Sequence, residues 1–309
     1  MLRRRGFIFL VKSLFIVVVL YLLIVPSAVA LSDDVIRTKF EQVFKEVSGA
    51  ESAGGDISTL LPKLNEAIAL LNSDKVSDVE KADLLINESR QGALVTHAAG
   101  VQAMNTQHIV VGVTLGILGA SALFLWLSGS RVEWDLWVRI RRKLGHESPV
   151  IDDNNKFVAL CIIALLMVIT VYPVLSANRV VERFSELGLL GSSGKLGGYP
   201  SKVVVGQMFN LFLYIGNKEG GIQYYRVDVK LDDQERNLRD VEPLQAPIIA
   251  SYSLVLNNSA NTTLPISLSV GEVGVNLRLV FELNSFDVKS STFKYRLWNQ
   301  LLLNVTAPG

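Results

Sequence analysis

Carboxylate side chains are the residues best suited to acid–base chemistry in the C-terminal third of this sequence. Eight lie between residues 232 and 287: Asp232, Asp233, Glu235, Asp240, Glu242, Glu272, Glu282 and Asp287. Glycosidase chemistry needs two carboxylates that converge on one cleft, whereas most of these fall at predicted turns or outward-facing positions. The stretch DDQERNLRD at 232–240 also lacks the Asp-x-Asp-x-Asp-Gly spacing of a calcium loop. We therefore expect a solvated surface and no catalytic residue.

Histidine and cysteine are too few and too scattered to form a reactive or metal-binding set. The histidines, His97, His108 and His146, fall in three separate segments, and none lies beyond residue 200. A Ser-His-Asp set is therefore excluded in the C-terminal region. The single cysteine, Cys161, allows neither an intramolecular disulfide nor a multi-cysteine zinc site. We expect no metal and no other cofactor.

Asn-x-Ser/Thr tripeptides are chemical sites of a different kind, because they accept N-linked glycans outside the cytoplasm. They begin at Asn87, Asn257, Asn261 and Asn304. Such tripeptides also arise by chance, so they become glycosylation candidates only where the predicted topology places them outside.

Three apolar runs determine how these sites are placed relative to a membrane. Residues 1–30 combine a basic front, a short apolar stretch, Pro26 and the small-x-small sequence Ala28-Val29-Ala30, which is typical of a cleaved signal peptide. An uncleaved signal anchor is the alternative, and both place the chain after Ala30 outside the cytoplasm. Residues 109–128 and 157–176 are each long and apolar enough for a transmembrane helix.

The distribution of positive charge gives the same orientation. The connecting segment 129–156 is rich in Lys and Arg, whereas the fifteen residues before residue 109 contain neither. The positive-inside rule therefore places 129–156 in the cytoplasm and 31–108 and 177–309 outside, together with all four glycosylation candidates. We expect a multi-pass plasma-membrane protein with a cytoplasmic basic loop that faces the headgroups of membrane lipid through Arg139, Arg141, Arg142 and Lys143.

Small residues recur within the apolar run 109–128. Gly112, Gly116 and Ala120 are four residues apart, a spacing that lets two helices approach closely. We interpret them as helix-packing candidates, facing either the second transmembrane helix or a partner's helix; the alternative is that glycine is simply common in membrane helices. Neither apolar run contains Asp, Glu, Lys, Arg or His, which argues against a transporter.

The two outer segments differ in hydrophobic period. Residues 31–108 have apolar residues at helical spacing and are predicted to form an external helical module; the first stripe is Val35, Phe40, Val43, Phe44 and Val47, and the second is Leu60, Leu61, Leu64, Ile68 and Leu71. A third helix is expected to run on toward residue 109. Residues 178–190 are predicted as a short amphipathic helix, followed by a Gly/Ser/Pro linker, so that 177–200 form a stalk and linker.

From residue 201 the period changes to two. About seven short strands with turn signals between them predict an immunoglobulin-like β-sandwich over 201–309. The stretch FNLFLYIGNKEGGIQYYRVDVKL, Phe209 to Leu231, is predicted as one hairpin of it, with its turn at Gly216 to Gly221. The fold class is therefore a membrane protein with an α module, two transmembrane helices and an all-β C-terminal domain.

Several short motifs resemble a known family. The second transmembrane run, the stretch RFSELGLLGSSGKLGGYPSKVVVGQMFNLFLYIGNKEG from Arg183, and the closing WNQLLLNVTAPG resemble archaeal membrane proteins grouped as "domain of unknown function 1616". The most specific elements are Gly197-Gly198-Tyr199-Pro200, Val205-Gly206-Gln207, Ile215-Gly216-Asn217 and Trp298-Asn299-Gln300. The resemblance covers roughly the last 150 residues. It implies an archaeal envelope protein with an external sandwich, and it supplies no catalytic residue.

These observations favour a binding or structural role. A net charge of +1 without a concentrated basic face argues against nucleic acid as a partner. We expect a non-catalytic cell-envelope protein whose sandwich binds or braces another envelope protein or a surface glycan. The alternative is an accessory subunit of a membrane enzyme or export complex, for example one for surface glycan assembly; an ectoenzyme is the third hypothesis.

Overall fold

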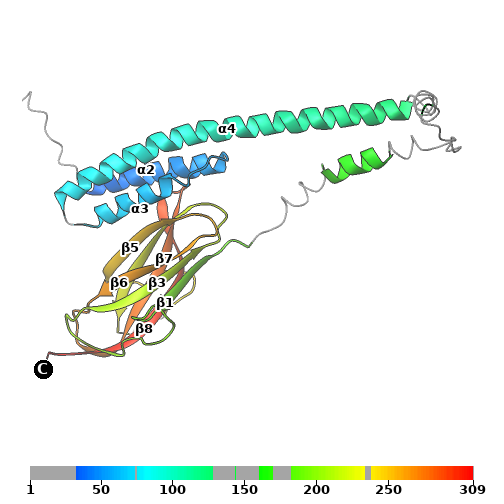
Figure 1. The fold of residues 1–309 in the computed structure, drawn as a ribbon. Coiled ribbons are helices and arrows are strands. Elements are labelled where there is room, and N and C mark those ends of the chain that lie inside the picture. Colours follow the sequence, from blue (N-terminus) through cyan, green and yellow to red (C-terminus); the bar gives the residue numbers. More distant parts are fainter. Residues whose placement is uncertain are drawn as a thin grey trace, which may run out of the picture. The chain divides into compact units, whose positions relative to one another are not determined.

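The computed structural model describes residues 33–73, 75–127, 143, 160–169, 182–233 and 238–308 (Figure 1). These residues form two compact units. The first contains the described residues of Met1–Ser52, Asp56–His97 and Ser185–Gly309, and the second contains Ala53–Gly55 and the described residues of Ala98–Phe184. The predicted signal segment 1–30 and nearly all of the basic loop 129–156 lie outside the described residues.

Three helices form the α part of the first unit, and we call it the helical layer: α2 (Asp33–Ser52), α3 (Leu60–Leu71) and the residues of α4 (Val76–Leu127) up to His97. The predicted stripes are confirmed by buried Phe40, Phe44 and Leu64. Val35 was placed on the wrong face, because it is 55% exposed and its neighbour Ile36 is buried instead. Helix α4 continues without interruption into the apolar run at residue 109, as expected.

Eight strands form the remainder of the first unit, the β-domain: β1 (Ser185–Leu190), β2 (Lys202–Val204), β3 (Phe209–Asn217), β4 (Gln223–Asp232), β5 (Ile248–Leu256), β6 (Asn261–Leu268), β7 (Gly274–Asp287) and β8 (Thr292–Thr306). A three-stranded sheet has the order β1-β3-β6, and a five-stranded sheet has the order β2-β8-β7-β4-β5. All paired strands are antiparallel except β2 and β8, which are parallel.

The core of the β-domain lies between its two sheets and follows the predicted alternation. From the three-stranded sheet, β3 contributes Leu211, Leu213 and Ile215. From the five-stranded sheet, β4 contributes Tyr225, Val227 and Val229, and β7 contributes Leu279, Phe281 and Leu283. Because successive side chains on a strand point to opposite faces, every second residue of these strands enters this core.

The predicted hairpin at Phe209–Leu231 is wrong, because β3 and β4 belong to different sheets. Strand β3 pairs with β1 and β6, whereas β4 pairs with β5 and β7. The connection between them therefore crosses from one sheet to the other. Buried Asn217 holds this corner, since its side-chain amide donates to the carbonyls of Gly221, Leu256 and Asn257 at 2.8–3.0 Å. Glycine-rich turn signals do not distinguish a hairpin from such a corner.

The amphipathic helix predicted for 178–190 is also wrong over its second half. Residues Ser185–Leu190 form strand β1, which pairs with β3 along its whole length. The sequence SELGLL fits the strand period of two as well as the helical period, and Ser185 and Leu189 are buried. Pairing with β3 makes this segment a strand. The following Gly/Ser/Pro stretch is a loop as expected, and it is held to the β-domain by Tyr199, whose hydroxyl donates to the Leu189 carbonyl at 2.7 Å.

The second unit contains the membrane-spanning candidates. Among the described residues, one helix is long and apolar enough to cross a membrane, and it lies within Ser77–Phe124 of α4. Leu160–Ile169 is a shorter apolar helix inside the second predicted transmembrane segment. The other residues of that segment, 157–159 and 170–176, lie outside the described part of the chain. A second crossing therefore stays a prediction.

Candidate functional site

The outer face of the five-stranded sheet carries a row of buried polar side chains. Strands β4 and β7 pair so that Asp228 lies opposite Glu282, and Arg226 lies opposite Asn284. The buried polar residues of this sheet are Asp228, Lys230, Asp232, Glu282, Asn284 and Ser285. The expectation of a solvated surface is therefore wrong for Asp232 and Glu282, although Asp240, Glu242 and Glu272 are exposed as predicted.

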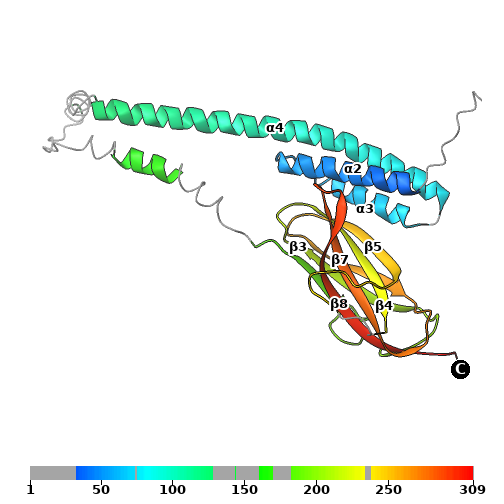
Figure 2. The same cartoon turned by 180° about the vertical axis from the view of Figure 1, so that it is seen from behind.

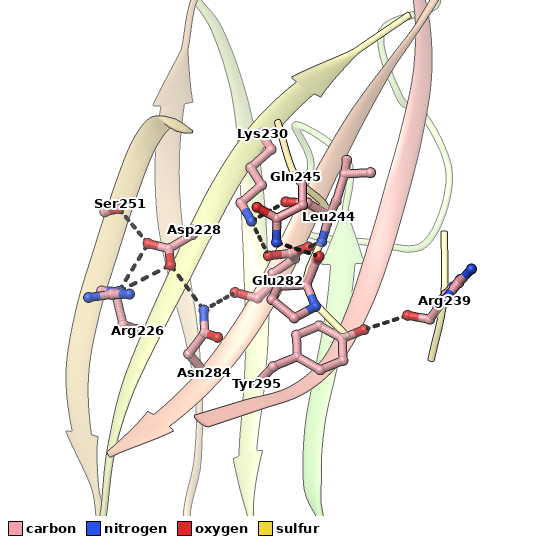
Figure 3. Close-up of polar contacts among 11 residues, drawn as sticks. Arg226, Asp228, Lys230, Arg239, Leu244, Gln245, Ser251, Glu282, Asn284 and Tyr295 are labelled. Carbon is pink, nitrogen blue, oxygen red and sulfur yellow. Dashed lines mark hydrogen bonds and ion pairs between the residues drawn. The ribbon is translucent and has the colours of Figure 1, made fainter. Parts of the chain in front are cut away.

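A buried ion pair lies at the centre of this face (Figure 3). The Lys230 ammonium is 2.6 Å from Oε2 of Glu282, and it donates to the Leu244 carbonyl at 2.6 Å. The Leu244 amide in turn donates to Oε1 of Glu282 at 2.5 Å. These three residues form a closed triangle, so the chain around Leu244 is held against the sheet.

We call residues 238–247 the cover segment, because they run across this face between β4 and β5. Its first residues are held by β8: the Tyr295 hydroxyl donates to the Arg239 carbonyl at 3.4 Å, and the Trp298 indole donates to Asp240 at 3.2 Å. Burial raises the pKa of Tyr295 to about 12, so its phenol is a protonated donor at neutral pH. The cover segment is thus tied both to β8 and to the Lys230–Glu282 pair.

A second polar cluster surrounds Asp228. Its carboxylate accepts hydrogen bonds from Ser251 at 2.6 Å and from the Asn284 amide at 3.0 Å, and it pairs with Arg226 at 3.1 Å. The Arg226 guanidinium also lies 4.4 Å from the ring centroid of Phe293. Nearer the other end of β4, Asp232 forms an ion pair with Arg278.

The ion pairs and hydrogen bonds of this face limit what its carboxylates can do chemically. A general acid or base must reach a substrate, but Glu282 is 1% exposed and both of its oxygens already accept from Lys230 and Leu244. Asp228 likewise already contacts Ser251, Asn284 and Arg226. In this arrangement the carboxylates position the cover segment and neighbouring strands rather than meet a ligand from solvent.

The helical layer contacts the same sheet at one end of the β-domain, where Figures 1 and 2 show α2 and α3 lying against the strands. Phe40 and Phe44 of α2 pack on Tyr224 of β4, with ring centroids 5.0 and 5.7 Å apart. Phe286 and Phe293 complete the aromatic cluster. These residues belong to one continuous apolar core that also contains residues of α3 and α4.

Polar contacts fix the register of this junction. Asn65 of α3 donates to the Val255 carbonyl at 2.9 Å and accepts from the Val255 amide at 2.7 Å, so its side chain pairs with the backbone of edge strand β5. Glu51 of α2 accepts from the Ile222 amide at 2.8 Å. Both contacts satisfy backbone groups that a sheet end would otherwise leave to water. The predicted external helical module is therefore integrated with the β-domain.

The structure places the predicted site residues as follows. Asn257 and Asn261 are exposed, whereas Asn87 and Asn304 are half-buried. Gly112 and Gly116 face open space within the described part of α4, since a Cβ added to either would meet nothing within 4 Å; Ala120 is exposed. In the basic loop, Lys143 is exposed, and Arg139, Arg141 and Arg142 lie outside the described residues.

No metal-binding group of three or more His, Cys, Asp or Glu side chains occurs within the residues that the structure describes. The Lys230–Glu282 pair was missed by the sequence reasoning. A signal was present in β4, where charged residues of alternating sign occupy every second position from Arg226 to Asp232, but only the pairing register with β7 brings Lys230 close to Glu282.

The β-domain can be compared with known families. Residues 179–296 match the family described as "Domain of unknown function (DUF1616)". The DUF1616 match thus covers only the C-terminal part of the chain, and we call residues 179–296 the DUF1616 region. The match confirms the predicted resemblance and its place in the chain. It includes β1 to β7 and the beginning of β8, so the DUF1616 region contains both partners of the buried ion pair, while Trp298-Asn299-Gln300 lies beyond it.

Solved structures resemble the chain only distantly. A chain of the complex between zinc 2-glycoprotein and prolactin inducible protein from human seminal plasma is 9% identical, with 42% of this chain and 100% of that chain covered and a TM-score of 0.27. The CARDB domain of the PF1109 protein from Pyrococcus furiosus is 10% identical, with 40% and 88% covered and a TM-score of 0.26. A β-glucosidase from Listeria innocua is 12% identical, with 40% and 16% covered and a TM-score of 0.25.

These similarities carry no conclusion about the function of the DUF1616 region. The chain covers about a sixth of the Listeria innocua β-glucosidase, so that enzyme's activity does not transfer to it. No curated protein matches the chain.

Proposed function

We propose that this chain is a non-catalytic membrane protein of the cell envelope, with its helical layer and its β-domain both outside the cytoplasm. In this proposal the external body binds or braces another surface component, either a protein or a glycan. The family match adds no assigned activity, so the proposal rests on architecture.

The observation that carries the proposal is the core shared by the helical layer and the β-domain. Residues from both pack in one apolar cluster, and therefore both must lie on the same side of any membrane. Helix α4 leaves the helical layer and enters the apolar run 109–128. If that run crosses the bilayer, the chain must cross back before β1 begins at Ser185. The apolar segment 157–176 is placed to provide that return crossing.

The strand order supports an immunoglobulin-like sandwich within this proposal. In immunoglobulin-like domains the first, second and fifth strands lie in one sheet, and the third, sixth and seventh lie in the other. If the short strand β2 is left out of the count, β1, β3 and β6 are the first, second and fifth strands here, and they form one sheet. The third, sixth and seventh strands are then β4, β7 and β8, which lie together in the other sheet. Domains of this architecture serve widely as cell-surface modules, which favours binding over catalysis.

The test is the sidedness of three single cysteines in a Cys161→Ser background: Val35→Cys in the helical layer, Leu196→Cys in the β-domain and Lys143→Cys in the basic loop. All three positions are exposed. A membrane-impermeant maleimide applied to intact cells is expected to label the first two, and to label Lys143→Cys only after permeabilisation. Labelling of Leu196→Cys and Lys143→Cys on the same side would refute the proposed topology.

The second candidate function is an accessory subunit of a membrane complex. It is favoured by the open space beside Gly112 and Gly116, which leaves room for a partner's helix. Gly116→Ile is expected to lower the recovery of a stoichiometric partner at least tenfold when the protein is purified gently from its native membrane. Ser121→Ile, on another side of the same helix, is the control. Unchanged recovery with Gly116→Ile would eliminate docking through this surface.

A further inference from the structure

The four glycosylation candidates differ sharply in their surroundings. Two lie four residues apart at the β5–β6 turn: Asn257 follows β5, and Asn261 is the first residue of β6. Asn257, Ser259, Asn261 and Thr263 are all exposed. The side-chain oxygen of Asn257 makes one local hydrogen bond, because it accepts from the neighbouring Asn258 amide at 2.8 Å. Within the part of the chain that the structure describes, β6 is an edge strand that pairs with β3 alone, and the turn before it is therefore approachable from outside.

The other two candidates are integrated into the packed structure. The Asn87 amide donates to Asp83 at 3.1 Å within α4, and the hydroxyl-bearing residue of its tripeptide, Ser89, is 0% exposed. Asn304 lies in β8, between β2 and β7. Its backbone amide donates to Ser201, and its side-chain oxygen accepts from the Asn276 amide at 2.7 Å. A glycan on Asn304 would displace a contact that links β8 to β7, and a glycan on Asn87 would displace its hydrogen bond to Asp83 beside the buried Ser89.

We propose that the β5–β6 turn carries the N-linked glycan of this protein, on Asn257, Asn261 or both, and that Asn87 and Asn304 carry none. The inference rests on the proposed extracytoplasmic location and adds the modified site. In the reaction, the side-chain amide nitrogen attacks the anomeric carbon of a lipid-phosphate-linked oligosaccharide. A C–N bond forms, the bond from that carbon to the phosphate oxygen breaks, the lipid phosphate leaves and the nitrogen loses one proton.

A glycan at this turn would also shield the edge of the three-stranded sheet. Edge strands expose unpaired backbone groups that can add a strand from another chain. Strand β6 already contains Pro265, which lacks a backbone N–H donor. A bulky, hydrated glycan at Asn261 would protect the part of the edge before Pro265. The glycan and the proline would therefore both hinder strand addition along β6.

The experiment is glycopeptide mass spectrometry of the full chain purified from its native membrane, together with gel mobility of two sequon-removal variants. Ser259→Gly with Thr263→Val removes both turn sites, and Gly suits the positive φ of 61° at residue 259. Ser89→Ala with Thr306→Val removes the other two. We expect the first variant to lose the whole glycan-dependent mass, and the second to keep it.

Sidedness is read in parallel from Leu196→Cys in the Cys161→Ser background. Labelling from outside, with sugar confined to Asn257 or Asn261, supports the inference. Labelling from outside with both turn sites unmodified, or with sugar on Asn87 or Asn304, overturns the inference and leaves the proposed function standing. Labelling only after permeabilisation overturns the proposed location and the inference with it.

Discussion

Glu282→Gln is expected to destabilise the β-domain by about 3 kcal/mol, because it leaves the Lys230 ammonium buried without its counter-charge. Glutamine keeps an oxygen for the Leu244 amide, so the change isolates the loss of charge from the loss of that hydrogen bond. The cover segment should loosen first, since Leu244 bonds to both members of the pair.

Hydrogen exchange of the full chain in detergent measures this effect. Peptides from β4, β7 and the cover segment are expected to exchange about a hundredfold faster, since each 1.4 kcal/mol is about a factor of ten. Glu272→Gln, at an exposed carboxylate, is the control and should change little.

Replacing both charged residues tests whether an unpaired buried charge causes the destabilisation. Lys230→Met with Glu282→Met removes the buried charges together and should recover part of the stability, leaving a loss of about 2 kcal/mol because the Leu244 amide and carbonyl both lose their partners. If the double variant were as unstable as Glu282→Gln alone, an unpaired buried charge would not explain the loss.

Phe44→Ala is expected to cost about 3–5 kcal/mol, the usual range for truncating a buried aromatic side chain. The Phe44 ring packs on Tyr224 and Phe286, with centroids 5.7 and 5.9 Å away. Its loss opens the core between the helical layer and the β-domain. The effect should be larger in α2 and α3 than in β3 and β6, whose buried residues belong to the separate core between the sheets.

The same exchange measurement reports on both regions. Peptides from α2 and α3 should exchange at least a hundredfold faster in Phe44→Ala, and Val35→Ala is the matched control on the exposed face of α2. Equal acceleration in β3 and β6 would contradict the prediction, because the helical layer and the β-domain would then open as one cooperative unit.

Sequence periodicity was sufficient to locate a helix or a strand where one face of that element is buried. The spacing of Phe40, Phe44 and Leu64 located the helices, and the alternation of Leu211, Leu213 and Ile215 located β3. It failed at β1, where six residues satisfy a strand and a short amphipathic helix equally well. It also failed at the β3–β4 connection, because the same turn residues serve a hairpin and a corner between sheets.

The candidate site was less accessible to sequence reasoning. Asp232 and Glu282 have the pattern of solvated residues on the polar face of a strand, and they are buried because the Arg278 guanidinium and the cover segment lie over them. That cover is a property of tertiary structure, set by residues far away in the chain. The sequons, in contrast, were visible as motifs, and the structure separated the exposed pair from the packed pair.

The shared core also sets an order of events during synthesis. The apolar face of α2 is made well before Tyr224, Phe286 and Phe293, the side chains that cover it. Until the chain has been extended through Phe293, the newly made helices have an uncovered aromatic surface. Contacts between residues so distant in sequence form slowly, and an incomplete chain with exposed apolar surface is prone to associate with others. Biogenesis of this protein therefore includes an interval in which its helices need protection from aggregation while the β-domain is still being made.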